Sequence, residues 1–175
     1  MPIDESLPFH PLRIALLTVS DTRTLATDES GAILEARVRN HGHEVTRREL
    51  VKDDADLIAT KLEAWCDAED VDVIITTGGT GLTGRDVTPE AFARVWEKEI
   101  PGFGELFRWL SFQKIGTSTV QSRATAGVAR GTYLFALPGS KGAVKDGWDG
   151  ILETQLDNRH RPCNFAELVP RLRER

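Results

Sequence analysis

Short apolar segments alternate along the chain with segments in which apolar residues recur at helical spacing. Residues 13–20 (RIALLTVS), 71–77 (VDVIITT) and 132–137 (TYLFAL) are apolar or β-branched runs of the kind found in strands that are buried on both faces. Residues 43–51 form a weaker run of the same type. These four segments predict the strands of a sheet.

Helices are predicted between these strands, and their ends carry recognisable signals. Gly42 suits the residue that follows a helix, and Asp54 suits an N-cap. Thr88 is expected to cap another helix, with Pro89 at its first position. The predicted helices are residues 31–41, a segment with Leu57, Ile58, Leu62 and Trp65, a segment from Thr88 through Trp96, a segment with Leu106, Phe107, Leu110 and Phe112, and residues 142–156.

Strands that alternate with helices predict an α/β fold, with a parallel or mostly parallel sheet covered on both faces. The 175 residues suit a single domain, and we expect a core of about residues 12–165 between short tails. Ligands of such folds bind at the carboxyl ends of the strands. Three polar loops are therefore predicted to meet at one edge of the sheet, namely Ser20-Asp21, residues 78–86 and residues 138–141.

The loop at residues 78–86 (GGTGLTGRD) is the strongest candidate for chemistry. Its glycines directly follow a predicted buried strand, so backbone N–H groups can approach a ligand without side chains in the way. Anions are the usual ligands of such loops. Residues 79–84 spell G-x-G-x-x-G. A dinucleotide fingerprint would have these glycines open the helix, whereas three residues separate Gly84 from Thr88.

The same loop does not match the P-loop motif either, and the two residues that differ indicate another kind of site. Gly79 and Gly84 have the right spacing, but Arg85 and Asp86 stand where Lys and Ser or Thr are required. A carboxylate beside phosphates repels them unless a cation lies between. Asp86 therefore fits a Mg²⁺ ligand, a base or a positioning group better than a phosphate contact.

Each of these features also has a structural interpretation. The glycine loop could be a tight turn whose aspartate caps the next helix, and residues 53–54 are more typical of an N-cap than of a site. Ser20-Asp21 fits binding and structure about equally. Ser122-Arg123 fits a helix cap and a surface charge at least as well as a ligand contact.

Composition narrows the class of protein. With 27 acidic and 22 basic residues the net charge is −5, which argues against non-specific binding to nucleic acid. Asp4-Glu5 lies where a secretory signal would be basic, and no apolar run reaches the roughly 20 residues of a membrane span. We expect a cytoplasmic protein with no membrane partner. Cys66 is expected in the core, and His41 and His43 are expected to be exposed or to cap a helix end.

Residues 76–91 (TTGGTGLTGRDVTPEA) resemble the signature of the MoaB/MogA family of molybdenum-cofactor biosynthesis proteins. The IGTST run at 115–119 and the RPCNF run at 161–165 point to the MoaB branch of that family. The resemblance covers nearly the whole chain, and its further segments are residues 16–23 (LLTVSDTR), 101–119 (PGFGELFRWLSFQKIGTST), 121–129 (QSRATAGVA), 135–140 (FALPGS) and 155–165 (QLDNRHRPCNF).

The resemblance implies a three-layer α/β/α sandwich that assembles as a homotrimer or, in the MoaB branch, a homohexamer. It implies binding of molybdopterin, a pterin that bears a dithiolene and a phosphate. It also implies a nucleotidyltransferase activity, in which MgATP adenylylates molybdopterin to give adenylyl-molybdopterin and pyrophosphate. Other proteins of the molybdenum-cofactor pathway are implied partners.

By the same resemblance, Asp53 and Asp86 are the catalytic acids and the candidate Mg²⁺ ligands. Lys141 departs from the family pattern, in which the basic residue lies one place later, and Lys145 is its candidate substitute. The positions that resemble the family's substrate- and nucleotide-binding residues are Ser20, Asp21, Thr77, Gly78, Gly79, Thr80, Gly81, Ser122, Arg123, Pro138, Gly139 and Ser140.

Two other functions remain open at this point. A non-catalytic oligomer that carries molybdopterin in the same pathway would use the same pocket without consuming ATP. A nicotinamide-dependent oxidoreductase rests only on the G-x-G-x-x-G spelling of the loop.

Overall fold

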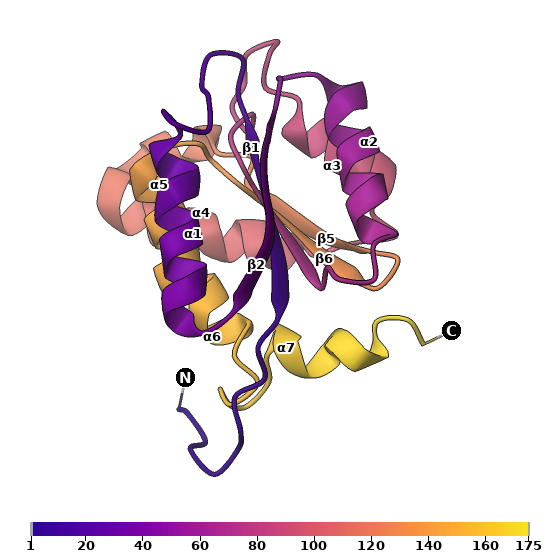
Figure 1. Cartoon of the computed structure of the whole chain (residues 1–175). Coiled ribbons are helices and arrows are strands. Elements are labelled where there is room, and N and C mark those ends of the chain that lie inside the picture. The colour runs from indigo at the N-terminus through magenta and orange to yellow at the C-terminus, as the bar shows by residue number, and fades with distance from the viewer. Residues whose placement is uncertain (1, 175) are drawn as a thin grey trace.

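The computed structural model describes residues 2–174, which contain a six-stranded sheet in the order β2-β1-β3-β6-β5-β4 (Figure 1). The first four of these strands are parallel, whereas β5 runs antiparallel to β6 and β4 antiparallel to β5. The strands are β1 (Arg13–Val19), β2 (Glu44–Val51), β3 (Val73–Thr77), β4 (Lys98–Glu99), β5 (Thr125–Ala129) and β6 (Thr132–Leu137).

Helices cover both faces of the sheet, so the predicted three-layer α/β/α sandwich is confirmed. Alternate residues of β1 enter two separate cores: Ile14 packs with the α1 side, and Ala15 packs with the α2 side. Burial on both faces explains why the central strands are apolar without alternation. One layer holds α1 (Glu29–His41), α4 (Pro101–Ile115) and α5 (Lys141–Gly147), and the other holds α2 (Ala55–Cys66) and α3 (Thr88–Val95) (Figure 1).

Shorter helical segments complete the chain. The predicted helix 142–156 is helical throughout, but a π-helical turn, Trp148–Leu152, separates α5 from α6 (Glu153–Gln155). The remaining segments are the 3₁₀ helix η1 (Gly116–Gln121), α7 (Phe165–Leu168) and the 3₁₀ turn η3 (Val169–Arg171). None of the helices within residues 2–174 is both long and apolar enough to span a membrane.

The antiparallel edge of the sheet is absent from the sequence-based prediction. The turn between β5 and β6 consists of Arg130 and Gly131, both with positive φ (53° and 84°), as in a two-residue primed hairpin. Arginine is unusual at the first of these positions, where Asn, Asp or Gly is expected. The hairpin therefore lacks its usual sequence signal.

Two local predictions are wrong. Thr88 is the first residue of α3 rather than its cap, and its hydroxyl donates a hydrogen bond to the Gly78 carbonyl at 2.9 Å. His43 is neither exposed nor a cap, because it is only 5% exposed and its Nδ1 accepts the Leu12 N–H at 3.1 Å. Asp54 does cap α2, and Cys66 is buried, as predicted.

We expect the free energy of unfolding to decrease below pH 6.5 because of His43. Burial, with a smaller contribution from His41, lowers the pKa of His43 from 6.5 to about 4. Between these values the unfolded chain binds a proton that the folded chain does not, so stability is complete above pH 6.5 and is lost as the pH falls toward 4. The slope is about 1.4 kcal/mol per pH unit.

Chemical denaturation at several pH values measures this effect. The wild type should lose about 2 kcal/mol between pH 6.5 and pH 5 through this group. His43→Asn, which keeps an acceptor for the Leu12 N–H, should be less stable at pH 7 and less dependent on pH. An unchanged slope in the variant would contradict the assignment to His43.

Candidate functional site

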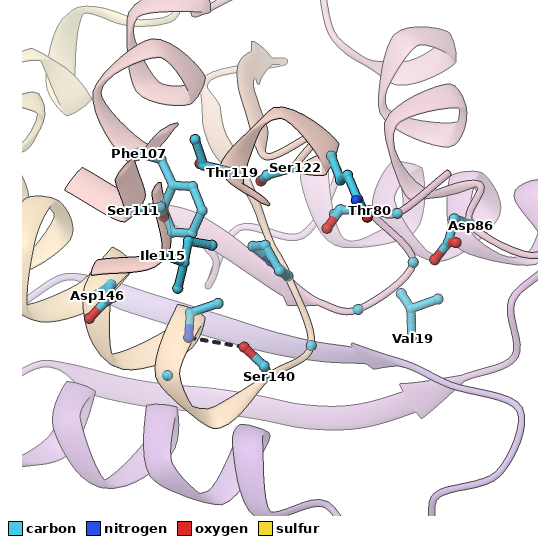
Figure 2. Close-up of a pocket in the computed structure, with 18 of the residues that line it drawn as sticks. Val19, Thr80, Asp86, Phe107, Ser111, Ile115, Thr119, Ser122, Ser140 and Asp146 are labelled. Carbon is cyan, nitrogen blue, oxygen red and sulfur yellow. Dashed lines mark hydrogen bonds between the residues drawn. The ribbon is translucent and has the colours of Figure 1, made fainter. Parts of the chain in front are cut away.

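A cleft of about 1000 Å³ opens where β1, β3 and β6 end (Figure 2). The three polar loops predicted to meet at this edge do meet there. Of the residues singled out from the sequence, those that line the cleft are Ser20, Asp53, residues 78–81, Asp86, Ser122 and residues 138–140. The lining does not include Asp21, Thr77 or Arg123.

Two glycines bring the glycine loop close to the end of β1. Gly78 and Gly79 have φ values of 101° and 66°, which are strained for other residues. A Cβ on Gly78 would collide with the Val19 carbonyl oxygen, and one on Gly79 would collide with the Thr88 hydroxyl. The Gly78 N–H also donates to the Leu137 carbonyl at 2.9 Å, which ties the loop to β6.

Asp86 is held by its own loop. One carboxylate oxygen accepts hydrogen bonds from the Thr83 N–H at 2.9 Å and from the Thr83 hydroxyl at 2.7 Å. Burial alone would raise the pKa of Asp86, but these hydrogen bonds outweigh it and keep the pKa below its usual value. Asp86 is therefore ionised at neutral pH.

Asp53 lies in a different electrostatic environment. Burial, followed by the nearby carboxylates of Asp21 and Asp86, raises its pKa. The Asp53 N–H donates to Asp21 at 3.3 Å, and Asp21 forms an ion pair with Arg85 of the glycine loop. Asp21 therefore links the end of β1 to the Asp53 backbone and to the glycine loop from outside the cleft lining.

This arrangement suits a hard divalent cation. Burial and the neighbouring carboxylates both raise the pKa of Asp53, and a cation would offset both effects; carboxylate oxygens are ligands that Mg²⁺ prefers. Within residues 2–174 no three His, Cys, Asp or Glu side chains are grouped to hold a metal ion. Asp53 and Asp86 would thus hold Mg²⁺ together with phosphate oxygens, as is common for this ion.

Arg123 stabilises the glycine loop by donating hydrogen bonds to its carbonyl groups. Its Nε donates to the Gly81 carbonyl and a terminal nitrogen donates to the Asp86 carbonyl, both at 2.7 Å. The guanidinium also pairs with Glu90 of α3. Its donors thus hold both ends of the segment 81–86, so in this structure Arg123 positions Asp86 from behind the loop. Thr77, the last residue of β3, is buried and likewise lies outside the lining.

The loop after β1 contains two further residues, Arg23 and Asp28, that were not predicted as part of the site. Asp28 is 1% exposed and accepts from the Thr18 hydroxyl at 2.6 Å, the Gly31 N–H at 3.0 Å and Arg48 at 3.2 Å. Arg23 donates to the Gly139 carbonyl at 3.2 Å and lines the cleft. The sequence gives one indication of the role of Asp28, namely its position just before a predicted helix, where an aspartate can act as the N-cap.

The far wall of the cleft comes from α4, η1 and α5, and it was also missed. Its residues include Phe107, Ser111, Ile115, Ser118, Thr119 and Asp146. Lys141 pairs with Glu29 and does not line the cleft, whereas Lys145 does. The basic residue on this side is therefore Lys145, the candidate substitute for the shifted Lys141.

The sequence and the fold match those of known proteins. Residues 15–158 match the family model described as a probable molybdopterin binding domain. Over 160 residues the chain is 49% identical to molybdenum cofactor biosynthesis protein B of Escherichia coli (strain K12), covering 91% of this chain and 94% of that protein. The protein of the same name from Bacillus subtilis (strain 168) is 46% identical over 146 residues, or 83% and 86% of the two chains.

Solved structures agree with these sequence matches. A crystal structure of molybdenum cofactor biosynthesis protein B superimposes with a TM-score of 0.85 at 40% identity, covering 95% of this chain and 98% of that one. A MogA structure gives 0.75 at 30% identity, covering 91% and 99%. The fold and the matched domain place the molecule in the class of α/β molybdopterin-binding domains. The chain belongs to the molybdenum cofactor biosynthesis protein B family.

Proposed function

We propose that the protein adenylylates molybdopterin with MgATP in molybdenum cofactor biosynthesis. The observation that carries the proposal is the convergence of Asp53, Asp86 and the glycine loop on one cleft at the carboxyl ends of the strands. Phosphoryl-type transfer needs positioning and charge neutralisation more than a covalent nucleophile, and these residues supply both. The family match supports the choice of the pterin as the acceptor.

Each group has a role in this reaction. The backbone N–H groups of Gly79 and Thr80 bind phosphate oxygens of ATP, and Asp53 and Asp86 would hold the cation. Bound Mg²⁺ would neutralise charge on the phosphates. A phosphate oxygen of molybdopterin attacks the α-phosphorus, the bond from that phosphorus to the bridging oxygen breaks, and pyrophosphate leaves with the electron pair.

Pyrophosphate release tests the proposal. Purified protein with molybdopterin, Mg²⁺ and ATP should release one pyrophosphate for each adenylyl-molybdopterin formed, and omission of the pterin should reduce the release to background. The absence of any pterin-dependent pyrophosphate would refute the proposed activity.

A non-catalytic molybdopterin carrier is the second candidate. The Thr83 hydrogen bonds to Asp86 favour it, because they give that carboxylate a structural role without any metal. A carrier would bind molybdopterin without consuming ATP, and Asp86→Asn would leave the pterin affinity almost unchanged. Calorimetry with molybdopterin alone separates the two functions.

We further propose that the chain assembles as a homotrimer or homohexamer through α4. Exposed apolar side chains gather on α4 and the following η1, and this is unfavourable for an isolated chain. The molecular mass in solution, from light scattering, tests the assembly. These side chains are Leu106, Trp109, Phe112, Ile115 and Val120.

A further inference from the structure

β2 forms one edge of the sheet, and its outer side pairs with no strand among residues 2–174. This edge strand is eight residues long and lies between the layers that contain α1 and α2 (Figure 1). The Val51 carbonyl accepts the Ser20 N–H at 2.9 Å, so the backbone groups of Val51 face β1. Since these groups alternate along a strand, those of Arg48 and Leu50 point away from the sheet. An edge of this kind is a template for pairing with another chain.

Polar side chains of β2 are poorly satisfied within the chain. Six buried side-chain atoms lack a hydrogen-bond partner in the described part of the chain, and three of them belong to successive residues of this strand. They are the Thr46 hydroxyl, one terminal nitrogen of Arg47 and the Nε of Arg48. Buried polar atoms without a partner are unfavourable. Their concentration at the open edge indicates that a further chain completes this edge.

The sequence of β2 is complementary to itself. In an antiparallel pair of β2 strands with a two-fold axis at Arg48, Arg47 lies opposite Glu49 of the second copy. The same register places Val45 opposite Val51 of the second copy. An axis at Arg47 or at Glu49 would instead place two like charges directly opposite each other, which is destabilising. Charge complementarity therefore selects both the partner, a second copy of this chain, and the register.

Arg47 and Glu49 are available for contacts across the edge. Their side chains are 29% and 44% exposed. Within the chain, Arg47 pairs with Asp70 at 2.8 Å and Glu49 pairs with Lys61 at 2.6 Å. Both are surface ion pairs, which contribute little to stability, so pairing across the edge competes with no strong contact. Leu57, which is 49% exposed, lies one helical turn before Lys61 and adds apolar surface on the same side.

The position of the axis is compatible with two arginines. Arg48 pairs with Asp28 at 3.2 Å and with Glu35 at 3.0 Å in its own chain. Each guanidinium that approaches the axis is therefore already neutralised by carboxylates of its own chain, and the repulsion between the two is small.

We propose that β2 pairs with β2 of a second copy in antiparallel orientation, about a two-fold axis at Arg48. The two sheets then form one continuous sheet, and each opposite-charge contact occurs twice because the axis repeats it. Charged residues on an edge strand usually prevent pairing, whereas here they disfavour only the other registers. The contact uses no residue of α4, and it does not depend on the proposed activity.

A charge swap tests the pairing. Arg47→Glu should weaken self-association about 10-fold to 100-fold, because both cross-strand pairs become repulsive. Arg47→Glu combined with Glu49→Arg restores opposite charges and should recover most of the wild-type association. The dissociation constants are measured by sedimentation velocity on the full chain over a series of concentrations. Lys98→Glu makes the same charge change at an exposed position of β4, the other edge strand, and should leave self-association unchanged.

Disulfide cross-linking tests the register. Residues opposite each other in a pair of this kind have Cα atoms about 4.5 Å apart, within the range that a disulfide spans. In a Cys163→Ser background, which removes the exposed thiol, an oxidised equal mixture of Arg47→Cys and Glu49→Cys chains should give a covalent dimer. Neither variant should do so alone. A non-reducing denaturing gel detects this dimer and is insensitive to non-covalent assembly through α4.

Each outcome decides the proposal. Recovery of association in the swapped chain, together with a covalent dimer from the mixture alone, would establish the pairing. Equal dissociation constants for the wild type and Arg47→Glu, no recovery in the swapped chain, or cross-linking of Arg47→Cys with itself would overturn it. If the edge instead accepts a strand from a different protein, the mixture would give no covalent dimer, which also overturns the assignment to a second copy.

Discussion

Replacing Asp86 by Asn should lower molybdopterin-dependent pyrophosphate release by about two to three orders of magnitude, the usual effect of losing one electrostatic contact to a transition state. The amide is almost isosteric and still offers an oxygen to the Thr83 N–H, so the loop should keep its shape. What is lost is the negative charge that holds the cation. Asp53→Asn should have an effect of similar size, because Asp53 is the other candidate ligand.

The control and the metal dependence make this result specific. Asp56→Asn removes a carboxylate that is 87% exposed and paired with Arg94 on α3, and it should keep the wild-type rate. If the two acids hold the cation, a higher Mg²⁺ concentration should restore part of the activity of Asp53→Asn. A near-wild-type rate in Asp86→Asn would leave the loop aspartate with its structural role alone and favour the carrier.

The architecture was predictable because the central strands are buried on both faces. Such strands are continuous apolar runs in the sequence. A helix between two consecutive strands indicates that the strands run parallel. The short strand β5 (TAGVA) escaped prediction because its residues are mostly small. Gly127 in it is needed for space, since a Cβ there would lie 2.7 Å from the Trp96 ring. Such a contact depends on the residue that follows α3, which is distant in the sequence.

The location of the cleft was predictable from topology, but the contacts of single residues around it were not. Parallel strands bring their carboxyl ends together, so the residues after β1, β3 and β6 had to meet. Sequence could not indicate that Arg123 would donate to two carbonyls of the glycine loop, because that depends on how η1 packs beside the loop. The α4 wall was missed because a helix face that lines a cleft has the same apolar pattern as one that lines a core.

Asp21 and Arg123 illustrate how the loop is held in position. Asp21 pairs with Arg85 from the β1 side, and Arg123 donates to carbonyls from the η1 side. Neither residue lines the cleft, yet both fix the segment that carries Asp86. These two charged residues, which resemble ligand contacts in the sequence, therefore support the loop, whereas Asp53 and Asp86 line the cleft itself.

Asp28→Ala should lower the free energy of unfolding by about 3–5 kcal/mol, the typical cost of removing one partner of a buried ion pair. The variant would leave three donors without this acceptor: the Thr18 hydroxyl, the Gly31 N–H and one terminal nitrogen of Arg48. Arg48 is itself largely sheltered, with a side chain that is 19% exposed, so water cannot easily replace the lost contact.

Urea denaturation at pH 7 measures this loss, and a second aspartate–arginine pair provides the comparison. Asp149, whose side chain is 51% exposed, pairs with Arg37, and Asp149→Ala should shift the midpoint only slightly because exposed pairs contribute little. Asp28→Ala should also weaken the anchoring of α1 and the preceding loop to Gly139, which Ser30 and Arg23 both contact. Equal midpoints for the two variants would mean that Glu35, the other carboxylate on Arg48, is enough to hold that guanidinium.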